Sequence, residues 1–165
     1  MAKPILLSAL LGAVGLAASG PQPGEPFPPH RVVGNVYYVG SKALSAFLIT
    51  TDQGHILVNT GFDHTVPIIR DGVKQLGFRF EDIRIILASH AHGDHVGGHA
   101  SVKRATGAKV MVMAGDDETV RTGGRNAPQK GGPWEAVEVD HVLRDGEVVS
   151  LGDVRLTAHL TPGHT

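Results

Sequence analysis

A cluster of candidate metal ligands constrains this chain more than any other feature of its sequence. His90, His92, Asp94 and His95 fall between Ser89 and Gly98, with small residues between them. Zinc prefers imidazole and carboxylate ligands, and a catalytic zinc usually takes three protein ligands and keeps one position for water. Residues two apart point to the same side of an extended segment, so His90 and His92 can share one metal. Asp94 and His95 then turn toward a second metal. The alternative is an exposed histidine-rich loop that binds metal only weakly.

The segments around the cluster predict an α/β arrangement. The apolar residues 83–88 predict a buried strand that ends at the cluster, residues 97–106 predict a helix, and residues 109–114 predict the next strand. Ends of strands are where α/β proteins build their sites, which favours a metal site over a weakly binding loop. His164 lies in a Pro-Gly turn after another predicted strand and is a candidate third ligand.

The remaining sequence predicts further strands and short helices. Glycine-rich residues 123–134 form the longest irregular segment, which is either a loop over an active site or an ordinary surface connection. The predicted strands cover 35–39, 46–51, 55–59, 142–151 and 154–160, and the predicted helices cover 66–76 and 116–122.

The first twenty residues differ from the rest of the chain. Lys3 precedes an apolar run over 5–18, and small residues follow it, so residues 1–19 predict a secretory signal peptide. The run is too short to span a bilayer comfortably, which disfavours a stable membrane anchor. We therefore expect a secreted or periplasmic protein. Residues 20–30 predict a flexible tail rich in proline and glycine.

Composition excludes some classes of protein. Fifteen basic and sixteen acidic residues are scattered, so no charged surface for nucleic acid is indicated. A hydrophobic content of 41% fits one globular domain. With no cysteine, the chain forms no disulfides and relies on its core and on metal.

The ligand cluster resembles that of a known family. Residues His90 to His95 match the His-x-His-x-Asp-His motif of the metallo-β-lactamase superfamily, and residues 161–164 are similar to its next metal-binding block. Blocks at 34–40, 54–61 and 106–109 resemble the third subclass of zinc β-lactamases, whose second zinc is bound without cysteine. The resemblance implies an α/β (α+β) fold, the αββα sandwich. Residues 31–165 would form its N-terminal half and the start of its second half.

The resemblance also implies two zinc ions and their ligands. His90, His92 and His164 would bind the first zinc, and Asp94 and His95 the second, whose remaining ligand is not in this chain. Asn59 stands where many superfamily members have aspartate, and it would orient a ligating histidine. The three remaining candidates are assigned to the surface or to ordinary structure; they are His99, His141 and His159.

The implied activity is hydrolysis of the β-lactam ring of antibiotics, which are small-molecule substrates. Zinc lowers the pKa of bound water from about 15.7 toward roughly 7, so a metal-bound hydroxide attacks without a strong protein base. Asp94 would be the catalytic residue that orients this hydroxide. Two alternatives stay open, namely a glyoxalase II-like thioesterase or lactonase of the same superfamily, and an inactive zinc-binding fragment.

A half-sandwich has a consequence for stability. It would leave one apolar face of the sheet uncovered, which soluble monomers rarely tolerate. We therefore expect the chain to be unstable alone, oligomeric, or part of a longer polypeptide, with its oligomeric state left open.

Overall fold

The computed structural model describes residues 24–164. The predicted signal peptide, residues 1–19, lies outside the described residues. Within the described part of the chain, no helix is long and apolar enough to cross a membrane.

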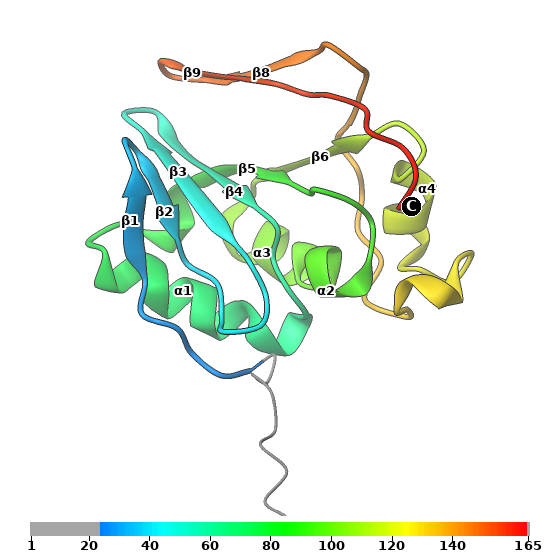
Figure 1. The fold of residues 1–165 in the computed structure, drawn as a ribbon, viewed down its shortest axis with the longest axis horizontal. Helices are drawn as coiled ribbons and strands as arrows, with labels where there is room; N and C mark the ends of the chain where they lie inside the picture. The colour runs from blue at the N-terminus through cyan, green and yellow to red at the C-terminus, as the bar shows by residue number, and fades with distance from the viewer. Residues whose placement is uncertain (1–23, 165) are drawn as a thin grey trace, which may run out of the picture.

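A mixed sheet of seven strands forms the central layer (Figure 1). Its strands follow one another in chain order, antiparallel from β1 to β4 and parallel from β4 to β7. Tight turns suffice between antiparallel strands, whereas the parallel strands β4, β5 and β6 need helical crossovers. The strands are β1 (His30–Val33), β2 (Val36–Tyr38), β3 (Phe47–Thr51), β4 (Gly54–Val58), β5 (Ile83–Leu87), β6 (Lys109–Met113) and β7 (His141–Leu143).

The apolar runs of β4 and β5 are explained by burial on both faces of the sheet. Ile56 pairs with Ile85, and Leu57 pairs with Ile86 in the parallel ladder. Successive side chains alternate between faces, so the first pair meets one layer and the second pair meets the other. All four are buried, as is typical of strands covered on both sides.

Helices cover one face of the sheet (Figure 1). In α1, Val66, Ile69 and Val73 are buried at the predicted spacing of three and four. The helices are α1 (Val66–Gln75), α2 (Gly93–Val96), α3 (His99–Thr106) and α4 (Asp117–Thr122), with 3₁₀ turns η1 (Asp63–Thr65), η2 (Phe80–Asp82) and η3 (Pro128–Lys130).

The helix predicted over 97–106 begins later than expected. The structure has a separate turn of helix, α2, and α3 starts at His99. The break falls at Gly98, whose N–H donates to the carbonyl of Gly61 at 3.0 Å instead of continuing the ladder of α2. The predicted end of the helix is confirmed, because Gly107 takes the left-handed conformation with a φ of 71°.

A two-stranded hairpin forms a second, smaller sheet over the other face (Figure 1). It consists of β8 (Val148–Leu151) and β9 (Val154–Thr157). The prediction of one strand over 142–151 is therefore wrong. Gly146 turns the chain with a φ of 77°, and the two halves join different sheets. Helices, central sheet and hairpin together confirm the predicted α/β fold class.

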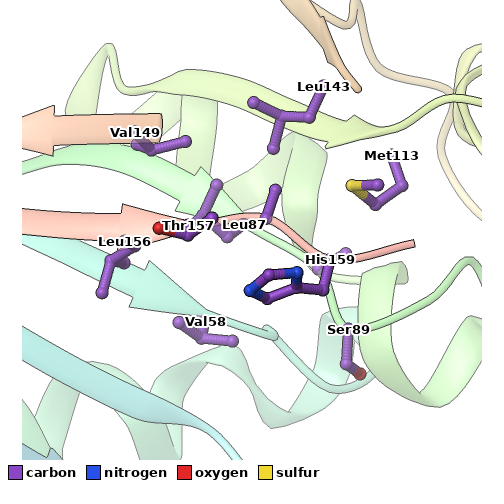
Figure 2. Close-up of a pocket in the computed structure, with 11 residues that line it drawn as sticks. Val58, Leu87, Ser89, Met113, Leu143, Val149, Leu156, Thr157 and His159 are labelled. Carbon is purple, nitrogen blue, oxygen red and sulfur yellow. The ribbon is translucent and has the colours of Figure 1, made fainter. Parts of the chain in front are cut away.

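The hairpin covers part of the face that was expected to be open. Val149 of β8 is buried against Ile49, Ile56 and Ile85 of the large sheet. A cavity of about 200 Å³ remains between the two layers. Figure 2 shows its lining, which includes Val58, Leu87, Met113 and Leu143 from the large sheet and Leu156 from the hairpin.

The described part of the expected tail, residues 24–30, makes specific contacts. The N–H of Lys42 donates to the carbonyl of Glu25 at 2.9 Å, and Pro26 forms a β-bridge with Ser41. Proline fits such extended edge positions because they need no N–H donor. The part of the expected tail over 24–30 is therefore joined to residues 41 and 42, and its flexibility stays a prediction.

Candidate metal centre

The candidate ligands lie at the carboxyl edge of the parallel strands, as the sequence predicted. Asn59 follows β4, Ser89 follows β5, and Asp116 follows β6. Because neighbouring parallel strands end at the same edge, loops distant in sequence meet there. The last described residues, 161–164, return to this edge after β9 and end near α4 (Figure 1).

Three histidines converge at this edge. His90, His92 and His164 each offer a ring nitrogen, and these nitrogens all lie within 4.8 Å of one another. The ring centroid of His164 is 4.6 Å from that of His90 and 4.6 Å from that of His92. Three imidazoles grouped in this way fit a zinc ion that keeps a fourth position open. A cavity of about 370 Å³ opens beside His90 and His164.

Asp94 and His95 lie on α2 beside this group. The His95 ring centroid is 4.0 Å from that of His90. Asp94 Oδ2 and His95 Nε2 are 3.5 Å apart, close to the roughly 3.4 Å that separates two ligands of a tetrahedral zinc with bonds of about 2.0–2.2 Å. Among the described residues, no third histidine or carboxylate joins these two in a ligand group. A second zinc at this pair stays a prediction.

Burial keeps two of these imidazoles neutral. Burial first, and then the neighbouring histidines, lower the pKa of His90 to about 4. Burial is also the largest cause of the lowered pKa of His95. A neutral imidazole is the form that binds a metal, so both rings are in the binding form at neutral pH.

Asn59 supports the site through Ser89. Its side-chain oxygen accepts a hydrogen bond from the N–H of Ser89 at 2.9 Å and lies 3.2 Å from the Ser89 hydroxyl. That hydroxyl is 3.2 Å from Nδ1 of both His90 and His95. Asn59 therefore reaches the histidines through one intermediate, not directly as the sequence suggested. Its φ of 64° suits asparagine, which tolerates the left-handed region better than most residues.

Asp116 is a supporting residue that the sequence did not single out. Its carboxylate accepts a hydrogen bond from the N–H of Ala91, between the first two histidines, at 3.1 Å. The same carboxylate is 3.7 Å from the ammonium group of Lys130, and only 14% of either side chain is exposed. The one sequence feature that pointed to a role for Asp116 was its position two residues after the predicted strand 109–114.

The glycine-rich segment 123–134 packs against the ligand loop. A Cβ placed on Gly93 would lie 2.7 Å from the carbonyl oxygen of Gly131 and 3.2 Å from the ring of Trp134. This close approach explains the glycine between His92 and Asp94. The segment therefore buttresses the ligand loop and is more than a surface connection.

We expect Gly93→Ala to destabilise the protein by about 1–3 kcal/mol, the usual cost of an overpacked site. Thermal unfolding with and without zinc measures both the stability and its metal dependence. Gly24→Ala is the matched control, because a Cβ there meets nothing within 4 Å. Equal melting temperatures for the two variants would contradict the packing argument.

His99 belongs to the interior, whereas His141 and His159 are exposed. The His99 ring is fully buried, and its Nδ1 is 2.8 Å from the Thr60 hydroxyl. His141 Nε2 contacts a carboxylate oxygen of Glu147 at the surface, and 72% of the His159 side chain is exposed. None of the three is in the ligand group among the described residues. Burial alone lowers the pKa of His99 to about 3.

The lowered pKa of His99 predicts a loss of stability in acid. Below pH 6.5 His99 is protonated in the unfolded chain, whereas in the folded chain it stays neutral down to about pH 3. The free energy of unfolding therefore falls as pH falls. From pH 8 to pH 5 this group alone costs about 2 kcal/mol. Urea unfolding with chelator at both values, compared with His99→Gln, isolates the effect. An unchanged pH dependence in the variant, or a His99 NMR titration near 6.5, would refute it.

Comparison with known proteins agrees with this fold and ligand group. Residues 39–165 match the family model of the metallo-beta-lactamase superfamily. The FEZ-1 metallo-beta-lactamase from Legionella gormanii superposes with a TM-score of 0.84 and 47% identity, covering 88% of this chain and 57% of that one. BJP-1, a subclass B3 metallo-beta-lactamase of Bradyrhizobium japonicum, gives 0.81 and 38%, covering 87% and 55%.

One curated relative is named for a different activity from that of the two solved structures, namely hydroxyacylglutathione hydrolysis. Over 93 residues the chain is 40% identical to a hydroxyacylglutathione hydrolase from Methylobacterium nodulans, which is 56% of this chain and 29% of that protein. The chain thus spans about a third of this relative and somewhat more than half of the two solved structures.

The fold, the histidine group and the match over most of the sequence define one class of protein. The chain belongs to the metallo-β-lactamase superfamily. The FEZ-1 and BJP-1 structures are both metallo-β-lactamases, BJP-1 being of subclass B3, which confirms the resemblance inferred from the sequence.

Proposed function

We propose that this chain carries the zinc-binding part of a secreted or periplasmic β-lactam hydrolase. The observation that carries the proposal is the similarity to metallo-β-lactamase structures, which extends over nearly nine-tenths of the chain at up to 47% identity. The identity to the hydroxyacylglutathione hydrolase from Methylobacterium nodulans is 40% over 56% of the chain, and another hydroxyacylglutathione hydrolase matches 80% of the chain at 31% identity. The export assignment rests on the sequence pattern of residues 1–19.

In this proposal one zinc ion is held by His90, His92 and His164. A second zinc ion is bound in part by Asp94 and His95. Zinc, when bound, polarises the substrate carbonyl and makes water nucleophilic at neutral pH. Asp94 accepts a hydrogen bond from the attacking water, and this bond directs a lone pair of the water oxygen toward the carbonyl carbon of the substrate. The cavity of about 370 Å³ beside the histidines lies within the range of small-molecule sites, about 300–1,000 Å³.

Thioester hydrolysis is the second candidate function. The 40% identity to a hydroxyacylglutathione hydrolase falls within the same superfamily, so the same ligand motif supports either reaction. A zinc-binding chain without activity is the third candidate, because only Asp94 and His95 are available to a second zinc among the described residues.

Two substrates separate these candidates. The 165-residue chain, supplied with zinc, is assayed with the chromogenic cephalosporin nitrocefin and with S-lactoylglutathione, and His92→Ala serves as the control lacking a ligand. We expect zinc-dependent hydrolysis of nitrocefin that His92→Ala abolishes. Hydrolysis of the thioester alone would favour the second candidate, and binding of zinc with neither activity would favour the third.

A further inference from the structure

The Ser89 hydroxyl lies between two histidines that the proposed function assigns to different zinc ions. Its oxygen is 3.2 Å from Nδ1 of His90 and 3.2 Å from Nδ1 of His95. The third polar contact of the same oxygen is with the side-chain oxygen of Asn59, at 3.2 Å. One hydroxyl therefore has three polar neighbours, and the direction of each hydrogen bond can be worked out.

The backbone sets the direction of the first bond. The N–H of Ser89 can only donate, and it points to the Asn59 side chain at 2.9 Å, so Asn59 must present its carbonyl oxygen there. That oxygen carries no hydrogen. The Ser89 hydroxyl, also beside it, must therefore use its single hydrogen to donate to Asn59.

The remaining two bonds follow from the chemistry of a hydroxyl group. A serine hydroxyl has one hydrogen and two lone pairs. Once its hydrogen is given to Asn59, it can only accept from the two imidazoles. His90 and His95 must then both carry their hydrogen on Nδ1, which leaves both Nε2 lone pairs unprotonated.

The gap between His95 and Asp94 agrees with this arrangement. The 3.5 Å between Nε2 of His95 and the Asp94 carboxylate oxygen is longer than an ordinary N–H···O hydrogen bond, so this contact does not require a hydrogen on Nε2. The opposite tautomer would put a hydrogen in this gap, but it would leave a lone pair of Nδ1 facing a lone pair of Ser89.

We propose that Ser89 is a positioning residue that locks His90 and His95 into the tautomer that binds metal through Nε2, and thereby connects the two candidate zinc positions through one hydroxyl. The inference rests on the proposed zinc binding but not on the identity of the substrate. The tautomers exist before any metal is bound, so they can be tested in the metal-free protein.

The direct test is a long-range ¹H–¹⁵N NMR spectrum of the imidazoles at pH 7.5 with chelator present. We expect both rings to be protonated on Nδ1 in the unmodified chain and in Ser89→Thr, which keeps the hydroxyl. In Ser89→Ala both rings should shift toward protonation on Nε2. Zinc affinity should fall by roughly 10–100-fold in Ser89→Ala, as is typical when a partner of a ligating histidine is lost.

Ser150→Ala is the matched control, because Ser150 lies on β8 and is exposed. It should leave both the tautomers and zinc affinity unchanged. Rings protonated on Nε2 in the unmodified chain would overturn the proposal even if Ser89→Ala did not fold. So would a folded Ser89→Ala with unaltered tautomers. Failure of nitrocefin hydrolysis alone would overturn only the proposed function, because the tautomers are measured without substrate or zinc.

Discussion

Replacing Asp94 with alanine is expected to lower kcat/KM for nitrocefin by at least about 100-fold. A positioned group that handles a proton in the reaction typically contributes on the order of 10²–10⁴-fold. Asp94 would hold the attacking water, and its carboxylate lies beside His95 at 3.5 Å. With alanine there, the water loses its orienting acceptor. The measurement is steady-state hydrolysis at saturating zinc, with zinc content determined in parallel.

Two further variants make the Asp94 test specific. Asp71→Ala removes an exposed carboxylate on α1, away from the site, and should leave hydrolysis unchanged. Asp94→Asn keeps the size of the side chain but removes its charge, and it should also lose most of the activity. Near-normal turnover by Asp94→Ala would exclude the proposed role of this residue.

Local sequence patterns predicted those elements of the fold that are determined by residues close together in the chain. The apolar run of β5, the spacing of α1 and the stop at Gly107 all carry their signal within a few residues. Within 142–151, Gly146 marks a turn, but the sheet that each half joins is set by strand pairing, of β7 with β6 and of β8 with β9. The bridge between Pro26 and Ser41 likewise joins residues distant in sequence and could not be predicted from the pattern of 20–30.

The candidate site divides in a similar way. The candidate ligands could be identified from the sequence because a motif places His90, His92, Asp94 and His95 together. The supporting groups could not, because their partners are distant in the chain. Asn59 and Ser89 are 30 positions apart, and Ala91 and Asp116 are 25 positions apart. Only the meeting of parallel strand ends at one edge of the sheet brings these residues into contact.

Removing His164 is expected to weaken zinc binding by more than 100-fold. Losing a partner that merely orients a ligand already costs roughly 10–100-fold, and loss of a ligand costs more. His164 lies far from the other two ligands in sequence, yet its nitrogen is within 4.8 Å of theirs. In its absence, two imidazoles of this group remain among the described residues, too few for a site that usually takes three protein ligands.

The change is measured by titration with zinc and by the shift in unfolding temperature that zinc causes. Zinc at 100 times its dissociation constant stabilises the folded chain by about 2.7 kcal/mol, so a 100-fold weaker site loses most of this shift. His159→Ala is the matched control, because His159 lies on the same returning segment with an exposed ring outside the ligand group. Unaltered zinc binding by His164→Ala would remove His164 from the site. Two tightly held zinc ions per unmodified chain would instead show that Asp94 and His95 find further ligands.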